Sequence, residues 1–220
     1  MTALRIYAVA DIHGHESRLS RIRSVIAAER PDVLVAAGDI TSYTGADRII
    51  ALLNDMPVPV LAVRGNTDLA RVEDLFARHP NISPLNLTGI SVNGVPFAGL
   101  SGTIPVPFRS RIGIMEAKKL AGLASLVTPG TVVVVHTPPR GILDEAFGRF
   151  HAGSKGLAKM VKVARPLAVI CGHIHECPGV GRLGDSLVVN CNMGGGKGGA
   201  LIDIEDGCRV TVRMLSNFPS

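Results

Sequence analysis

The chain has 220 residues, of which 46% are hydrophobic and 19% are charged, so it has ample apolar material for a folded core and no signature of disorder. Its net charge of +5 is spread along the chain and only 4% of its residues are aromatic, which argues against nucleic acid as a partner. Because no apolar run approaches the roughly 18 residues of a membrane span and no secretory signal is recognisable, we expect a cytoplasmic protein with reduced cysteines and no membrane partner.

The first half of the chain alternates short apolar runs with helical patterns. Strands are predicted over residues 4–10, 32–36 and 58–63, and helices over 16–30 and 46–53. In the first helix Leu19, Ile22 and Val25 recur at helical spacing, and Pro31 closes the element. This order favours parallel strands that are joined by crossover helices.

The middle and the end of the chain add a hairpin and further strands. Asn93-Gly94 separates the alternating runs 85–92 and 95–100, which is a strong signal of a two-residue hairpin, and a loop is predicted over 101–111. Further helices are predicted over 116–126 and 154–164, and strands over 131–135, 167–171, 186–190, 200–204 and 209–214. Since neither a linker nor a repeat interrupts the chain, we expect one domain over residues 1–220, a mixed α/β sandwich.

Five predicted strands end in a turn that carries side chains able to bind a metal. These turns are Asp11-Ile12-His13, Gly38-Asp39, Gly65-Asn66-Thr67-Asp68, His136 and Gly172-His173-Ile174-His175. The carboxyl ends of strands in an open α/β sheet line one crevice, so residues distant in sequence meet there. Imidazole and carboxylate suit Zn, Mn or Fe, and a bridging carboxylate holds two such ions about 3.5–4 Å apart. One such turn is weak evidence, but five at one edge predict a metal site.

With these blocks in this order, the sequence resembles the calcineurin-like metallophosphoesterases, whose motifs run D-x-H, G-D, G-N-H-[DE], H and G-H-x-H. His136-Thr137-Pro138-Pro139 and His151-Ala152-Gly153-Ser154 are similar, more narrowly, to small prokaryotic phosphoesterases related to the Icc cyclic-nucleotide phosphodiesterase. The resemblance implies a four-layer αββα sandwich of two mixed sheets. It also implies hydrolysis of a phosphate ester, through attack by a hydroxide that bridges two metals.

The resemblance further implies two divalent metal ions (Mn, Fe or Zn) and a ligand for each at matching positions. Asp11, His13 and His175 would hold the first ion, Asn66, His136 and His173 the second, and Asp39 would bridge them. Asn66 would also touch the phosphate.

One position departs from the family pattern. The motif His that in many members helps to protonate the leaving group is Thr67 here, and a hydroxyl is no general acid at neutral pH. His15 and His151 are the nearest candidates in the sequence, although each is also compatible with an ordinary surface histidine. We therefore expect faster hydrolysis of aryl than of alkyl phosphodiesters, whereas equal rates would indicate that a working acid is present.

Several local features have alternative interpretations. Arg64, Arg109 and Arg111 are candidates to pair with a substrate phosphate, and the segment 103–108 to form a wall over the site. Asp68 or Thr67 is a candidate cap for a helix that starts near Leu69. The stretch 171–177 has the composition of a structural zinc site, and the glycine-rich stretch 194–199 resembles a phosphate loop without its helix, so a turn between strands is the simpler prediction.

Two classes of function remain open at this stage. The first is a phosphodiesterase that acts on a small phosphodiester or nucleotide, with a phosphomonoesterase as its nearest enzymatic alternative. The second is a non-catalytic, protein-binding scaffold such as the small retromer subunit, which the complete set of ligand positions argues against. A nuclease is disfavoured because the basic charge is diffuse, and homo-oligomerisation is left open.

Overall fold

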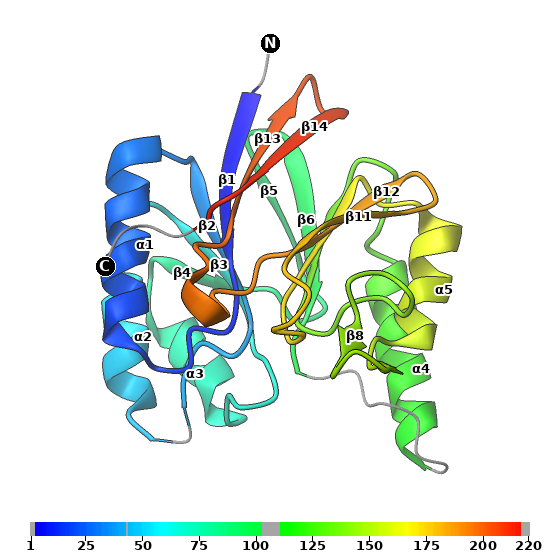
Figure 1. The fold of residues 1–220 in the computed structure, drawn as a ribbon, viewed down its shortest axis with the longest axis horizontal. Coiled ribbons are helices and arrows are strands. Elements are labelled where there is room, and N and C mark those ends of the chain that lie inside the picture. Colours follow the sequence, from blue (N-terminus) through cyan, green and yellow to red (C-terminus); the bar gives the residue numbers. More distant parts are fainter. Residues whose placement is uncertain (1–2, 43, 103–110, 217–220) are drawn as a thin grey trace.

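A computed structural model describes residues 3–42, 44–102 and 111–216, apart from the side chains of residues 111–116. Two six-stranded sheets pack face to face, and the helices cover their outer faces, α1, α2 and α3 on one side and α4 and α5 on the other (Figure 1). This arrangement confirms the mixed α/β sandwich that the sequence pattern predicts and the four αββα layers that the motif resemblance implies.

The first sheet has the strand order β14-β13-β1-β2-β3-β4. Its parallel part consists of β1 (Ala3–Val9), β2 (Val33–Ala37), β3 (Val60–Val63) and β4 (Ile82–Pro84). The strands β13 (Ala200–Glu205) and β14 (Arg209–Met214) add an antiparallel edge. The covering helices are α1 (Glu16–Glu29), α2 (Ala46–Asn54) and α3 (Arg71–Arg78).

The second sheet has the order β11-β12-β10-β7-β6-β5. Its strands are β5 (Gly89–Val92), β6 (Val95–Leu100), β7 (Val132–Val135), β10 (Ala168–Cys171), β11 (Gly179–Leu183) and β12 (Ser186–Asn190). The helices on this side are α4 (Arg111–Ala124) and α5 (Lys155–Ala164). A small hairpin has two strands of two residues each, β8 (Glu145–Ala146) and β9 (Phe150–His151). A 3-10 turn, Gly194–Gly196, completes the described elements.

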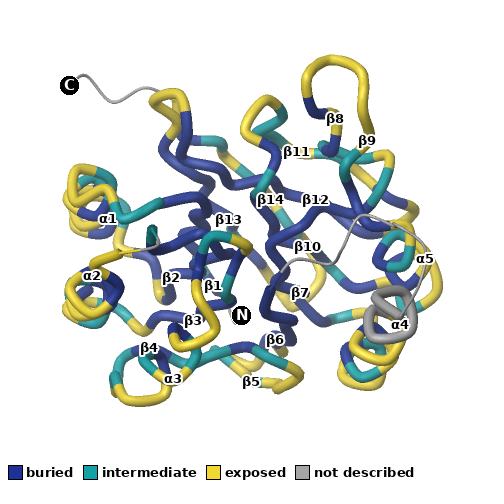
Figure 2. The backbone as a smooth tube through the Cα atoms, turned by 90° about the horizontal axis from the view of Figure 1, so that it is seen from below, coloured by how far each residue is buried: buried dark blue, intermediate teal, exposed yellow. Residues whose placement is uncertain are grey.

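Three apolar layers hold the four layers of secondary structure together. Along β1 the side chains alternate, because successive residues of a strand face opposite sides of a sheet. Tyr7 and Val9 pack in the layer under α1, α2 and α3, whereas Ile6 and Ala8 pack in the layer between the two sheets. The central strands are therefore buried on both faces, as the dark tubes of Figure 2 show, and this explains their continuous apolar sequences.

The structure differs from the sequence prediction in a few elements. The hairpin at Asn93-Gly94 is confirmed, but its first strand begins at Gly89, because Leu87 adopts a left-handed backbone with φ of 55° that breaks the run 85–92. Helix α4 begins at Arg111, earlier than predicted. The short strands β4, β8, β9 and β11 were not predicted, since each is brief or rich in Gly and Pro and so lacks a clear period.

The arrangement places the candidate ligands at one edge. The chain leaves the carboxyl ends of β1, β2, β3, β7 and β10 directly into the turns that carry them. Within the described residues no helix combines the length and the apolar character that a membrane crossing needs.

Candidate metal centre

The backbone at the candidate ligands is unusual. Asp11, His13, Asp39 and His173 all adopt positive φ, at 60°, 51°, 50° and 71°. Such a conformation costs a residue other than Gly about 1–3 kcal/mol and persists where the surroundings enforce it. Here the two neighbouring turns enforce it together, because the Asp11 N–H donates to Gly38 O at 3.0 Å and the His13 N–H donates to Asp39 O at 2.8 Å.

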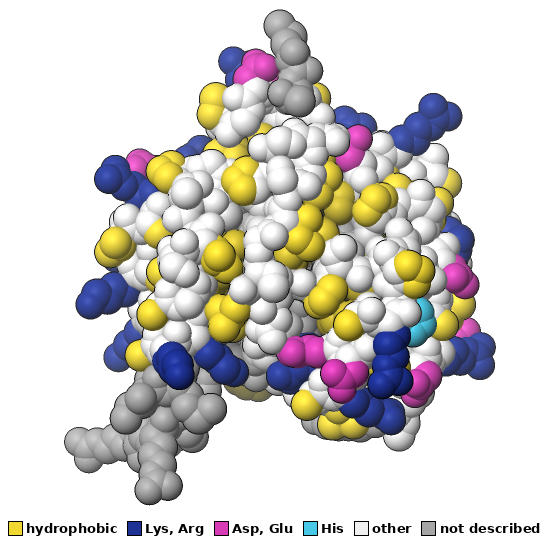
Figure 3. Space-filling model, turned by 180° about the vertical axis from the view of Figure 1, so that it is seen from behind, with side chains coloured by type: hydrophobic (Ala, Val, Ile, Leu, Met, Phe, Trp, Pro, Cys, Tyr) yellow, Lys and Arg dark blue, Asp and Glu magenta, His cyan; other side chains and the backbone are white. Residues whose placement is uncertain are grey.

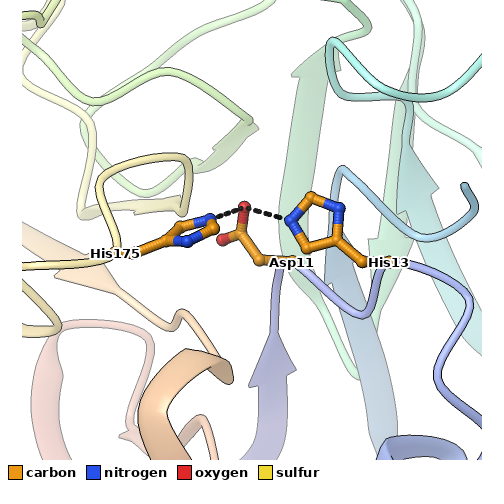
Figure 4. Close-up of side chains that lie close together, drawn as sticks. All are labelled: Asp11, His13 and His175. Atoms are coloured by element: carbon orange, nitrogen blue, oxygen red, sulfur yellow. Dashed lines mark hydrogen bonds and ion pairs between the residues drawn. The ribbon is translucent and has the colours of Figure 1, made fainter.

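Asp11, His13 and His175 form one group of potential ligands (Figure 4). Asp11 Oδ1 lies 3.1 Å from His175 Nε2 and 3.8 Å from His13 Nε2. The other oxygen of this fully buried carboxylate accepts hydrogen bonds from the His173 N–H at 3.0 Å and from Asn192 Nδ2 at 2.7 Å. One oxygen is thus held by the protein, and the other faces the two imidazoles.

His136 and Asp39 belong to a second group, which also contains Asp11. His136 Nδ1 lies 2.9 Å from Ala37 O, and because a carbonyl only accepts, Nδ1 carries the proton. When the ring is neutral, the lone pair on Nε2 faces Asn66 Oδ1 at 3.1 Å and Asp39 Oδ2 at 3.4 Å. Three acceptor atoms that face one another in this way require a cation or an extra proton between them.

The Asp39 carboxylate lies between the two groups. Its Oδ2 is 3.9 Å from His13 Nε2 as well as 3.4 Å from His136, and its Oδ1 accepts the Thr67 N–H at 2.8 Å. Burial alone would raise the pKa of Asp39, but the hydrogen bond and charge of His136 outweigh burial and bring the pKa down to about 2. Asp39 is therefore ionised at neutral pH.

The electrostatics of the imidazoles follow from burial and from the two carboxylates. Burial, aided by the charge of His136, lowers the pKa of His173 to about 4, so its ring is neutral and keeps a lone pair. This ring lies against His136, with centroids 5.0 Å apart. Burial also lowers the pKa of His13. The hydrogen bond to Asp11 raises the pKa of His175, and Asp39 raises that of the fully buried His136 against the effect of burial.

Two glycines allow the turns to approach so closely. A Cβ on Gly65 would overlap Asp39 Oδ1, and a Cβ on Gly172 would lie 2.6 Å from Asp11 Oδ2. Any side chain at either position would displace a carboxylate of the cluster. Each glycine thus stands directly before one candidate ligand and leaves space for another. Gly65 precedes Asn66 and leaves space for Asp39, and Gly172 precedes His173 and leaves space for Asp11.

Asp68 has a different role from the helix cap that the sequence suggested. Helix α3 has Ala70 at its N-cap and no side-chain capping bond. The buried Asp68 carboxylate instead accepts hydrogen bonds from four donors: Ile40 N at 3.1 Å, Thr41 N and Oγ1 at 2.7 Å each, and Gly65 N at 2.8 Å. It fastens the turn that carries Asp39 to the turn that carries Asn66, which local capping rules could not reveal.

Asn192 is a functional residue that the sequence analysis missed. Its Nδ2 donates to Asp11 Oδ2, and its Oδ1 accepts from the N–H of Gly194, so it links Asp11 to the glycine-rich turn. This turn is a 3-10 turn that leads into β13, as predicted, and does not start a helix. Asn192 also follows the end of a strand, β12, so the strand-end rule that identified the candidate ligands could have found it.

The remaining candidates from the sequence differ in how close they lie to the ligand cluster. Thr67 Oγ1 lies 3.5 Å from His13 Nδ1 and 3.2 Å from Thr41 O, beside the cluster. The Arg64 guanidinium bonds Glu73 through Nε at 3.2 Å and two backbone carbonyls through Nη1, and its role toward a phosphate stays a prediction. Arg109, the segment 103–108 and the side chain of Arg111 lie outside the described residues.

His15 and His151 lie outside both ligand groups in the described structure. His15 is exposed at the N-cap of α1 and forms no capping bond with its side chain. His151 lies on β9, where its Nδ1 is 2.8 Å from Asp144 Oδ1.

The alternative of a structural zinc site over 171–177 finds no support. Cys171 packs in the apolar layer under α4 and α5, and its thiol donates to Val189 O at 3.5 Å. The Cys177 thiol donates to Glu145 O at 3.2 Å. In the part of the chain that the structure describes, neither ligand group contains a cysteine.

A model of the calcineurin-like phosphoesterases matches residues 4–177 of the chain. The chain belongs to the calcineurin-like phosphoesterase family. This phosphoesterase is 30% identical over 220 residues to a UPF0046 protein of Caenorhabditis elegans, a match that covers 87% of the chain and 71% of that protein. It is 27% identical over 198 residues to an uncharacterized protein of Methanocaldococcus jannaschii, a match that covers 85% of the chain and 87% of the relative.

Solved structures show the same fold at lower identity. TT1561 of Thermus thermophilus has a TM-score of 0.70 at 19% identity, over 97% of this phosphoesterase and 99% of that chain. A dimetal phosphatase from Danio rerio has a TM-score of 0.70 at 12% identity, over 97% and 96%. An archaeal phosphodiesterase has a TM-score of 0.56 at 14% identity, over 96% and 100%.

Proposed function

We propose that this chain is a dinuclear metal-dependent phosphodiesterase that hydrolyses a small phosphodiester or nucleotide. The observation that carries the proposal is the convergence of His136 Nε2 with two acceptor oxygens, Asn66 Oδ1 at 3.1 Å and Asp39 Oδ2 at 3.4 Å. Asp11 and Asp39 are both buried, and within the described residues their ion pairs are all with imidazoles. Divalent cations would satisfy these groups, and the nitrogen and oxygen donors suit Mn, Fe or Zn.

The motif order assigns the donors to two ions, and the groups formed by distance agree with it for the first ion and for His136. In this proposal the first ion is held by Asp11, His13 and His175, the second by Asn66, His136 and His173, and Asp39 is shared. The positions of the Asp39 oxygens support the shared role, because Oδ2 approaches an imidazole of each group. Asp11 also contributes to both groups by distance, so it is the second carboxylate to test as a bridge.

The metals and the chain have separate tasks in the proposed reaction. When bound, two divalent ions provide a water of lowered pKa as the nucleophile and neutralise the charge of the phosphate. Asn66, an exposed side chain at the mouth of the cluster, orients a phosphate oxygen through its amide. The Thr67 N–H holds Asp39 in place, and Asn192 does the same for Asp11.

The nature of the substrate separates this proposal from its alternatives. A phosphomonoesterase would use the same ligands, and solved structures of this fold include both an archaeal phosphodiesterase and a dimetal phosphatase. A non-catalytic scaffold would not need the acceptor atoms to converge. On the face shown in Figure 3, Lys and Arg lie mostly around the edge, next to Asp and Glu at the lower right, and form no continuous stripe, which supports a small substrate over nucleic acid.

Metal analysis with a substrate pair tests the proposal. We expect the purified protein to carry about two metal ions per chain and to cleave bis(p-nitrophenyl) phosphate with Mn²⁺, Zn²⁺ or Fe²⁺, faster than p-nitrophenyl phosphate. Asp39→Asn should lower kcat/KM by about 10²-fold or more, since a metal contributes several kcal/mol to the transition state. The matched control is Asp74→Asn, an exposed carboxylate on α3. Absence of both metal and turnover would favour the scaffold, and preference for the monoester would favour a phosphomonoesterase.

A further inference from the structure

The hairpin of β8 and β9 contacts the segment that follows His175, although it supplies none of the candidate ligands. It lies in the connection between His136, at the end of β7, and helix α5. Its Glu145 carbonyl accepts a hydrogen bond from the Cys177 thiol at 3.2 Å, and Cys177 follows His175 by two residues. In Figures 1 and 2 the hairpin lies beside the segment that leads from β10 to β11.

The base of this hairpin holds a histidine and a carboxylate in a defined orientation. His151 Nδ1 lies 2.8 Å from Asp144 Oδ1, with 51% of the His151 side chain exposed and 1% of the Asp144 side chain. Asp144 Oδ2 accepts the Gly153 N–H at 3.1 Å, and the His151 carbonyl accepts from Arg140 Nη1 at 2.6 Å. Because an ionised carboxylate only accepts, Nδ1 keeps its proton, and Nε2 is the nitrogen that exchanges one.

The ligand cluster offers no side chain that could protonate the leaving group of the proposed reaction. Thr67 stands where many members of the family have a histidine, and its hydroxyl cannot release a proton at neutral pH. Imidazole is the side chain best suited to that task. His15 lies at the start of α1 and no capping bond orients its ring, whereas the ring of His151 is oriented by a buried carboxylate.

We propose that His151 is the leaving-group acid of this phosphodiesterase and that Asp144 is its positioning residue. The inference rests on the proposed function. As the bond between phosphorus and the leaving oxygen breaks, its electron pair stays on that oxygen, which takes the proton from His151 Nε2. Water supplies the oxygen that forms the new bond to phosphorus, and a solvent proton restores His151. The charged groups next to the pair of His151 and Asp144 are Glu145, on the facing strand, and Arg140, which donates to the His151 carbonyl.

The dependence of rate on the leaving group tests the inference. Two methyl aryl phosphodiesters are compared with Mn²⁺: the p-nitrophenyl ester, whose leaving group needs no proton, and the phenyl ester, whose leaving group does. We expect His151→Gln to lower kcat for the phenyl ester about 10²–10⁴-fold and to change kcat for the p-nitrophenyl ester only a few-fold. Asp144→Asn should show the same selective loss of kcat for the phenyl ester to a smaller extent, because the imidazole is still present but is no longer oriented.

Two controls separate catalysis from structure. Phe150→Ala removes a 66% exposed ring next to His151 but on the opposite face of the strand, and His79→Gln removes a histidine that bonds Leu75 O on α3. Both should keep the wild-type ratio of the two rates. Equal losses on both esters in His151→Gln, or no loss, would overturn the inference while the proposed function stands. A wild-type protein without metal-dependent turnover would instead overturn the proposed function.

Discussion

Replacement of Asp68 by Ala should loosen the metal centre without removing any ligand. The carboxylate accepts four hydrogen bonds at 2.7–3.1 Å and is 2% exposed. A hydrogen bond to a charged group contributes about 1.5–3 kcal/mol, and each buried donor left unpaired costs about 1–3 kcal/mol. Because water can enter the space and satisfy some donors, we expect a total loss of about 3–5 kcal/mol, comparable to breaking a buried ion pair.

Chemical denaturation of the metal-free protein measures this loss directly, and thermal melting should show a decrease of roughly 6–20 °C for a chain of this size. Asp68→Asn should lose less, since its Oδ1 still accepts from Thr41. The turns at Asp39 and Asn66 would separate in Asp68→Ala, so the affinity for Mn²⁺ should fall about 10–100-fold. Asp74→Ala is the control on the adjacent helix. A loss below about 1 kcal/mol, or one equal to that of the control, would refute the fastening role of Asp68.

Three further predictions concern the close packing, the charge and the metal of the site. Gly65→Ala should abolish Mn²⁺ binding seen by calorimetry, because its Cβ would overlap Asp39, whereas Gly130→Ala, where a Cβ meets open space, should bind normally. The pKa of His173 is lowered from 6.5 to about 4, so its contribution to stability is complete above pH 6.5 and lost as the pH falls towards 4. Urea denaturation of the metal-free protein should show this as a loss of up to about 3 kcal/mol that His173→Gln lacks, and equal slopes in the two proteins would contradict it. Chelation should lower the melting temperature, because metal at 100 times its Kd stabilises a protein by about 2.7 kcal/mol, and Asp11→Asn should show little metal-dependent shift.

The sequence alone predicted the sandwich and the site region because both depend on local patterns. Apolar runs that end in polar turns identified the strands. The same turns contain the candidate ligands Asp11, Asp39, Asn66, His136, His173 and His175. Strand ends meet at one edge of a sheet, so a list of such turns predicts which residues come together. The family motifs then supplied the division into two metals, which remains a prediction.

Tertiary structure decided what these residues do for one another. Asp68 bonds donors 28 residues away, and Asn192 bonds Asp11 across 181 residues, so no local pattern could assign either role. Arg64 is a plausible phosphate ligand in the sequence, yet its guanidinium is bound to Glu73 and to backbone carbonyls. His151 is an ordinary surface histidine until the fold places the buried Asp144 carboxylate at 2.8 Å from its ring. The sequence thus determined which groups gather at the edge of the sheets, and packing determined the hydrogen bonds and ion pairs that orient each of them.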